Sequence, residues 1–516
     1  MLGLILVPLL GTAIAFGLRL AGKPRDHLAR WILPAVTAVE LLLAIRIAFA
    51  FSAVPAEDPR LLASLPLGLA LGVDGISLPL LLLATALAFL AALTSLSSHP
   101  RLLDGAALQA LALAGIVGVL LAFDLALFFV FWLVAAAALL ALVRLFTSAQ
   151  ARPASVHLAA WLGLCGFAML VAFVVLWRYG QSVAIPELAR DDALSLDARL
   201  FGLSVVKLVA SALFVAFVGT MAATSLSGSI VRAVTEAPPA VGILVAGAFL
   251  PLGGYGLLRI AFETVPAASA WAAPTLAIAG LVIAVVGALR AAREDDLARF
   301  SLHAASAQLG LALLGFASMT PAGLQAGIVL LASHGLAVAM LLVLARALHE
   351  RVATRGLDRF GGLAQTMPAY AAFTALAACA AAGAPGFFGF VGVALGIGGA
   401  FPVYPALSLS ALVVLVVVGV VLARAFARLC FGTVPASWQS SPQLEPFGGK
   451  FPDLRRGEWL PLALASAALL VLGFWPHPIL RWLDLEAARL TDKLRPLGPM
   501  QIALEELWQK AVALFS

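Results

Sequence analysis

The run DLALFFVFWLVAAAALLALVRLF, residues 124–146, decides the fold class of this protein. Its only charged residues, Asp124 and Arg144, lie near its two ends. An α-helix rises about 1.5 Å per residue, so about 20 apolar residues cross the roughly 30 Å hydrocarbon core of a bilayer. The run therefore predicts a transmembrane helix.

Comparable runs recur along the whole chain. We expect an all-α membrane protein of about fourteen transmembrane helices, at residues 2–22, 28–52, 73–98, 104–122, 124–146, 157–180, 199–224, 237–261, 267–291, 299–318, 322–347, 369–398, 405–430 and 459–477. The first run lacks the basic start and cleavage site of a secretory signal, so we interpret it as a span.

Composition supports this class. Of 516 residues, 63% are hydrophobic and only 11% are charged, whereas soluble proteins are about one quarter charged. The net charge of +6 does not indicate nucleic-acid binding, because the positive residues lie mostly in loops. The expected surroundings are a lipid bilayer and other membrane subunits.

The loop charges predict an orientation. Loops after odd-numbered spans carry about twenty Lys and Arg residues, and loops after even-numbered spans carry about five. Because positive loops stay in the cytoplasm, both termini should lie on the outer, periplasmic side.

The twelfth span should be broken at depth. It contains Gly383-Ala384-Pro385-Gly386, and Pro385 removes a backbone donor and clashes with the preceding turn. A matching irregularity in the first half would fall in the seventh span, where Thr220 and several small or hydroxyl residues occur without a proline.

The C-terminal residues 481–516 differ from the bundle at 1–480, since they mix charges with apolar residues at helical spacing. We expect amphipathic helices lying on the membrane or on a partner subunit, with a disordered tail as the alternative.

Several strings resemble the antiporter-like membrane subunits of respiratory complex I, the proton-translocating NADH–quinone oxidoreductase, and in particular its subunit M (chain 4). The strings begin at Gly72 (GVDGISLP), Asp124 (DLALFFVFW), Glu236 (EAP), Gly253 (GGYGLLR), Ser333 (SHGL), Arg359 (RFGGL) and Phe451 (FPDL). The strings occur in the family's order and spacing, and the resemblance runs over residues 1–480.

The resemblance implies two inverted five-helix repeats, here roughly 104–261 and 267–430. It also implies partner subunits in a complex I-like hetero-oligomer of the bacterial inner membrane, and a non-catalytic part in a translocase. NADH, FMN, iron–sulfur clusters and quinone would be bound by partner subunits. This chain shows no nucleotide-binding motif and no cysteine cluster, because Cys165, Cys379 and Cys430 match no metal spacing.

The implied mechanism passes protons along charged and polar residues at mid-membrane, and here this chain departs from the pattern. The glutamate of the fifth helix and the two lysines of the seventh and eighth fall on Leu133, Thr220 and Pro251. The histidine of the tenth and the acid of the twelfth fall on Gln308 and Val393, and the histidine of the eleventh remains as His334. Leucine, valine and proline side chains hold no exchangeable proton.

Three hypotheses follow. The first is a membrane-arm subunit that is structural or has an impaired proton path. The second is an active proton or cation translocator that uses Lys207, His334 and ordered water. Thr220 and Gln308 are further proton-path candidates, because their side chains can order water. The third is the antiporter-like subunit of another assembly, such as a membrane hydrogenase, a cation/proton antiporter or an inorganic-carbon uptake complex.

Other polar residues have structural interpretations. Asp74 and Asp124 at span starts should cap their helices, and Glu236 should do so before the eighth helix. Lys207 should lie about 12 Å into the seventh span, where it either carries protons or extends its ammonium group to the interface. Glu40 and Arg46 share the second span and should pair with neighbouring helices or another subunit, or else reach the interface.

Overall fold

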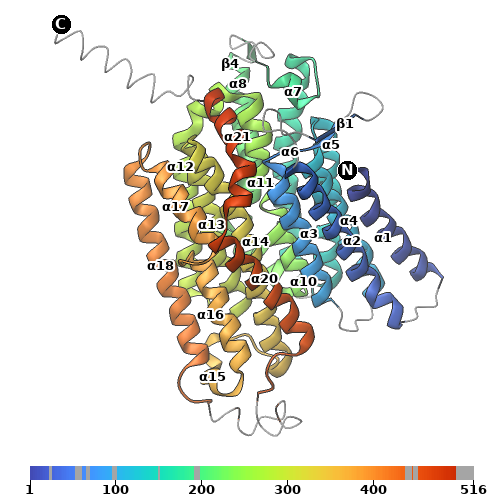
Figure 1. The fold of residues 1–516 in the computed structure, drawn as a ribbon, viewed down its shortest axis with the longest axis vertical. Coiled ribbons are helices and arrows are strands. Elements are labelled where there is room, and N and C mark those ends of the chain that lie inside the picture. The colour runs from blue at the N-terminus through green and yellow to red at the C-terminus, as the bar shows by residue number, and fades with distance from the viewer. Residues whose placement is uncertain are drawn as a thin grey trace, which may run out of the picture.

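The computed structural model describes residues 1–21, 26–52, 61–64, 70–95, 101–148, 152–190, 198–200, 202–435, 438, 444 and 451–494. Thirteen helices in these ranges are long and apolar enough to cross a membrane. Together with one broken crossing they confirm the expected multi-pass α-helical architecture (Figure 1).

The first six crossings are α1 (Leu2–Leu20), α2 (Asp26–Ser52), α3 (Ser77–Thr94), α4 (Leu102–Leu121), α5 (Leu125–Phe146) and α6 (Arg152–Gly180). The seventh is α8 (Val205–Leu226). The eighth consists of α10 (Pro239–Gly242), η2 (Ile243–Phe249), α11 (Leu252–Gly256) and η3 (Leu257–Phe262). The remaining long crossings are α12 (Pro266–Arg293), α13 (Leu297–Ala317), α14 (Pro321–Val352), α18 (Pro405–Cys430) and α20 (Arg456–Phe474).

Short elements connect these helices. They are β1 (Leu61–Ser64), β2 (Ala70–Val73), α7 (Ile185–Leu188), β3 (Arg199–Leu200), β4 (Leu203–Ser204), α9 (Gly228–Glu236), η4 (Leu357–Arg359) and α15 (Leu363–Thr366). β1 pairs with β2 in antiparallel register, from Leu61 opposite Val73 to Ser64 opposite Ala70. β3 and β4 form a short hairpin before α8, so the seventh helix begins at Val205 and not at the expected residue 199.

The twelfth crossing is broken, as its sequence predicts. α16 (Pro368–Ala382) ends at Gly383, whose φ of +67° is a left-handed conformation that favours glycine. Pro385 lies in the gap, and α17 (Phe388–Ala400) completes the crossing. In the first half, α8 continues through Thr220 and ends at Leu226, and Ser227 then caps α9 with its side-chain oxygen.

Three elements form the centre of the bundle. The eighth crossing, α13 and α14 are buried throughout their apolar windows. The edge helices α1, α2, α18 and α20 are largely exposed, and Figure 1 shows α1 and α2 on one side and α18 on the other. The apolar outer faces of these edge helices are available to lipid or partner chains.

The final described helix, α21 (His477–Leu494), packs on this chain. Its buried face comprises Ile479, Leu483, Glu486, Ala487, Leu490, Thr491 and Leu494. From residue 481 to Leu494 the apolar stripe of this segment packs on the bundle of its own chain, and contact with the membrane or a partner subunit stays a prediction. The expected boundary at 480/481 falls inside this helix, and the expected amphipathic helix within residues 495–516 lies outside the described residues.

Different elements mark the two ends of the bundle. The α21 end is where α3, α5 and α8 begin, and the α15 end is where α14 and α18 finish (Figure 1).

Candidate functional site

A buried charge cluster lies at the α21 end. The guanidinium of Arg259 pairs with the Asp74 carboxylate and donates through Nη1 to Oε1 of Glu263 at 3.0 Å. Arg489 of α21 donates to the same Glu263 oxygen at 3.3 Å and to Glu486 at 2.8 Å. Two of these groups, Arg259 and Asp74, are essentially inaccessible to solvent.

Aromatic side chains complete the surroundings of Arg259. Its guanidinium carbon lies 4.6 Å from the ring centre of Phe123, and its Nε donates to the Tyr255 hydroxyl at 3.2 Å. The Tyr255 hydroxyl in turn donates to the Leu120 carbonyl at 3.1 Å. The carboxylates, the hydroxyl and the aromatic ring together compensate the buried charge of Arg259. Removing one of its ionic partners should therefore destabilise the protein strongly.

Asp74 has a larger role than the expected helix cap. One carboxylate oxygen accepts from the Ile76 and Ser77 amides, at 3.2 and 3.0 Å, and the other pairs with Arg259. Burial by itself would raise the pKa of Asp74, but the charge and hydrogen bond of Arg259 hold that pKa below the ordinary value. The cluster therefore ties the start of α3 to the end of the eighth crossing and to α21. Sequence reasoning missed this pairing, although both residues belong to strings that carry the family resemblance.

Gly75 explains how α21 comes so close. A Cβ atom added at Gly75 would lie 1.9 Å from the backbone oxygen of Trp482. Only glycine permits this approach of α21 to the start of α3.

The other two expected caps differ from each other. Asp124 is the N-cap of α5 and accepts from the Leu127 amide at 2.7 Å and the Ala70 amide at 3.3 Å. Glu236 is the last residue of α9, and α10 begins after Pro238 without a side-chain cap. The expected Glu236 cap is therefore absent from the described start of α10.

The relay positions of the first half lie in apolar surroundings. Leu133 points to the outside of α5, while its neighbour Trp132 packs inward with its ring centre 5.6 Å from that of Phe249. Thr220 is buried, and its hydroxyl donates to the Ala216 carbonyl of its own helix at 2.7 Å. Phe128 fills the adjoining space against Phe173, Phe217 and Tyr255.

Pro251 lies where the eighth crossing changes register. The Leu250 amide donates to the Val245 carbonyl, five residues back, so η2 is a π-helix. The next amide in this register would be that of residue 251, which is a proline and has no N–H. The Ala246 carbonyl is therefore left without its π-helical donor. A proline inside a helix is expected to kink it, but it does not predict these widened turns, which are frequent at functional sites.

His334 occupies this vacancy. Its Nε2 lies 3.1 Å from the Ala246 carbonyl oxygen, and its Nδ1 lies 2.9 Å from the Ala305 carbonyl oxygen of α13. The imidazole is buried and bridges the eighth crossing and α13. A neutral imidazole has one N–H and can satisfy one of these oxygens, whereas a doubly protonated ring can satisfy both.

Gln308 contacts the broken crossing. Its Nε2 donates to the Ala380 and Ala381 carbonyls, at 2.9 and 3.1 Å, near the end of α16. The Ala380 carbonyl also accepts from the Gly383 amide at 3.2 Å, so Gln308 adds a side-chain donor at a helix end where backbone donors are few. Val393 packs beside the break, with Cγ2 3.0 Å from where a Gly383 Cβ would lie. Gln308 and Val393 thus hold the break that Pro385 introduces.

Lys207 lies in a different place from the relay positions. It is the third residue of α8, so it is near the end of the crossing and not about 12 Å inside it. Its side chain is exposed, and Nζ lies 4.7 Å from the ring centre of Trp271. Such a cation–π pair at an interface is typical of an anchor.

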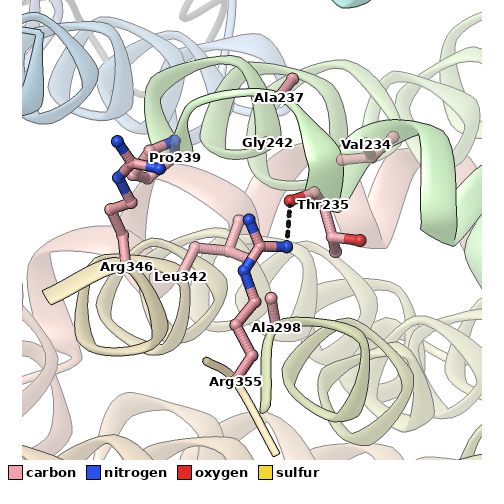
Figure 2. Close-up of a pocket in the computed structure, with 9 residues that line it drawn as sticks. All are labelled: Val234, Thr235, Ala237, Pro239, Gly242, Ala298, Leu342, Arg346 and Arg355. Atoms are coloured by element: carbon pink, nitrogen blue, oxygen red, sulfur yellow. Dashed lines mark hydrogen bonds between the residues drawn. The ribbon is translucent and has the colours of Figure 1, made fainter. Parts of the chain in front are cut away.

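Two adjoining pockets open at the α15 end. The smaller, of about 20 Å³, is lined by the ends of α9, α10 and α14 and has room for about one water molecule (Figure 2). Figure 2 shows Arg355 donating to the Thr235 carbonyl, at 2.8 Å, with Arg346 directed toward Pro239. The larger, of about 260 Å³, shares Pro239 and Arg346 and adds Glu350, Arg455 and Glu458. The polar groups next to the Glu236-Ala237-Pro238 string therefore lie together at the α15 end of the bundle.

Among the described residues, no three His, Cys, Asp or Glu side chains are grouped as metal ligands would be.

Comparisons with known proteins agree with this architecture. The family model described as "NADH:quinone oxidoreductase/Mrp antiporter, TM" matches residues 122–422. NAD(P)H-quinone oxidoreductase chain 4 1 of a Synechococcus species is 32% identical over 375 residues, which are 71% of this chain and 68% of that protein. Chain 4-3 of a Nostoc species is 32% identical over 58% of this chain and 52% of its own length.

Solved structures show the same fold at lower identity. A chain of respiratory complex I from Thermus thermophilus superposes with a TM-score of 0.79 at 24% identity, covering 95% of this chain and 99% of that one. A chain of the Mrp complex from Dietzia superposes with a TM-score of 0.79 at 21% identity, covering 96% and 99%.

Proposed function

The chain belongs to the NADH:quinone oxidoreductase/Mrp antiporter membrane family, and we propose that it is a membrane-arm subunit of a complex I-like assembly whose own proton path is impaired. In this proposal it serves as a structural member of the arm. Partner subunits bind the nicotinamide, flavin, iron–sulfur and quinone groups. The complex lies in a bacterial inner membrane with both termini of this chain on the outer side.

The observation that carries this proposal is the bonding of His334. Both ring nitrogens are directed at backbone carbonyls, of Ala246 and Ala305. A backbone carbonyl accepts a hydrogen bond but does not take up a proton and pass it on near neutral pH. The retained histidine therefore joins two helices and has no titratable acceptor on either side of its ring among the described residues.

The neighbouring relay positions support the same conclusion. Leu133 faces outward, the Thr220 hydroxyl is bonded within its own helix, and Gln308 is bonded to the carbonyls at the break. A proton relay needs groups of matched proton affinity within hydrogen-bond reach of one another. Aromatic side chains pack between α5, α8 and η2, where Phe128 meets Phe217 and Trp132 meets Phe249.

The assembly is proposed from the curated relatives, which are chains of NAD(P)H-quinone oxidoreductases. An Mrp-type antiporter complex is the second candidate, because one of its chains has the same fold over 99% of its length. Mass spectrometry of the proteins that copurify with a tagged chain separates the two. Soluble-arm subunits with iron–sulfur clusters are expected, and their consistent absence beside other antiporter-like chains would contradict the respiratory assignment.

A restoration experiment tests the impaired path. The variant L133E/T220K/P251K returns the expected carriers, and L133Q/T220M/P251A is the matched neutral control. Proton uptake by vesicles containing the intact assembly should be the same for both variants, because the surrounding helices are not built for conduction. Greater uptake in the charged variant alone would contradict the proposal.

A further inference from the structure

Glu40 lies in the middle of α2 and is completely buried. It is ten residues after Arg30 and twelve before Ser52 in the span, so it lies about 15 and 18 Å along the axis from those residues. It belongs to the buried stripe of α2, whose members are Leu33, Thr37, Glu40, Ala44, Ala48 and Phe51. This is the face that packs on the rest of the bundle.

The α1 helix covers the same level. A Cβ added at Gly11 would lie 2.8 Å from a Val36 methyl group, and one added at Gly3 would lie 3.8 Å from a Leu43 methyl group. Glu40 is between these two contacts along α2. On the other side, Leu33 of the same stripe clusters with Ala92 of α3 and Ala106 of α4. Glu40 therefore points into the layer formed by α1, α2, α3 and α4.

Neither carboxylate oxygen of Glu40 has a hydrogen-bond partner among the described residues. The nearest hydroxyl along α2, that of Thr37, donates to the Leu33 carbonyl at 2.9 Å. The Thr85 hydroxyl of α3 donates to the Leu81 carbonyl of its own helix at 2.9 Å. This orphaned acid is unlike Asp74 or Glu263, each of which has a guanidinium partner.

The charged residues of the packed helices lie elsewhere. α3 has none between Ser77 and Thr94, and α1 and α4 contribute Arg19 and Asp104, which pair with each other at 2.8 Å. Arg30 lies near the N-terminal end of α2. Arg46, six residues after Glu40, is on an exposed face of the same helix. Six residues correspond to about 600° of helical rotation, which places Arg46 on a different side of α2 from Glu40.

An isolated ionised carboxylate at this depth is very costly, because no cation or hydrogen-bond donor among the described residues compensates it. Binding of a proton removes the charge and leaves a neutral acid that the apolar layer tolerates. We propose that Glu40 is a proton-binding site at mid-membrane, in the α1–α4 layer and apart from the line of helices that carries Leu133, Thr220 and His334. The ligand is H⁺ and not a metal cation, since a metal needs several oxygen ligands and the described contacts supply a single carboxyl.

This site does not depend on the proposed function. It lies on a helix outside the relay positions, so Glu40 would hold its proton whether or not His334 conducts. If the chain takes up protons at depth at all, Glu40 is the acid that the described layer leaves free to do so.

Infrared difference spectroscopy tests the proposal on the intact assembly in native-lipid vesicles at pH 7. Subtracting the spectrum of Glu40→Gln from that of the wild type should reveal one neutral-carboxyl C=O band. The matched control is Glu486→Gln, a buried acid of α21 that is paired with Arg489 at 2.8 Å, and its subtraction should reveal carboxylate bands. Carboxylate bands from the Glu40 subtraction would overturn the proposal.

Glu40→Asp tests the proposal independently of whether Glu40→Gln folds. In Glu40→Asp the neutral-carboxyl band should shift in frequency and remain, because the acid is kept while its position changes. The Glu40→Asp spectrum is subtracted directly from the wild-type spectrum. Absence of neutral-carboxyl bands from this difference spectrum would also overturn the proposal.

Discussion

His334 on α14 lies 3.1 Å from the carbonyl oxygen of Ala246, the oxygen whose π-helical donor would be the amide of residue 251. Residue 251 is proline and has no N–H, and when Nε2 of His334 carries a proton the histidine side chain takes the place of that backbone donor. Pro251, where the family resemblance implies a lysine, thus bears directly on the hydrogen bonding of His334.

This relationship predicts coupling between the two residues. His334→Ala leaves the buried Ala246 carbonyl unpaired and should destabilise the protein by about 1–3 kcal/mol. Pro251→Ala restores an amide that can pair with that carbonyl, so the double variant should lose less stability than the sum of the two single variants. Thermal unfolding in detergent measures all three, and strict additivity would contradict the coupling.

Gln308 should be required for the break in the twelfth crossing. Gln308→Leu removes the donors to the Ala380 and Ala381 carbonyls and should lower the free energy of unfolding by about 1–3 kcal/mol. Gln325→Leu is the matched control, because Gln325 makes one exposed bond, to Asp484 at 2.7 Å, and its loss should change stability by less than about 0.5 kcal/mol. Equal losses of unfolding free energy in the two variants would contradict this requirement for Gln308.

The Asp74–Arg259 pair should make stability depend on pH. Because the folded-state pKa of Asp74 is lowered, its contribution is complete above the unfolded value of about 3.9 and is lost as pH falls through the folded value. Asp74→Asn leaves Arg259 with one acidic partner fewer and should cost about 3–5 kcal/mol at pH 7.

Unfolding of the wild type and Asp74→Asn at pH 7 and pH 3 checks this dependence, and the difference between them should shrink at the lower pH. Asp104→Asn, at the partly exposed Arg19 pair, should cost less than about 1 kcal/mol. A pH-independent gap for Asp74→Asn would contradict the assignment.

Lys207 should be dispensable for transport. Lys207→Ala removes a cation–π contact with Trp271, which is worth about 0.5–1 kcal/mol at an exposed site, and no proton carrier. Proton uptake by vesicles should match the wild type at equal assembly. Abolished uptake with an intact assembly would instead support a translocator that uses this lysine.

Much of the fold could be predicted from local pattern. The crossings follow from apolar length, and the break at Pro385 follows from a residue that cannot continue a helix. Boundaries were less accurate where a hairpin precedes α8, since Arg199–Leu200 and Leu203–Ser204 form strands within an apolar stretch.

The site depended on pairings that no local pattern encodes. Arg259 and Asp74 are 185 residues apart, and His334 and Ala246 are 88 apart. The π-helical register before Pro251 arises from tertiary packing in a fully buried crossing, so sequence periodicity gave no sign of it. The amphipathic pattern of α21 predicted a helix but could not say which surface covers its apolar face.

Whether His334 carries protons can be decided from proton uptake per electron by vesicles that contain the intact assembly, compared between the wild type and His334→Gln. Glutamine keeps an N–H for the Ala246 carbonyl and cannot titrate. The same ratio is expected in both, because in our proposal His334 joins helices and does not carry protons. A lower ratio in His334→Gln at undiminished assembly would contradict it.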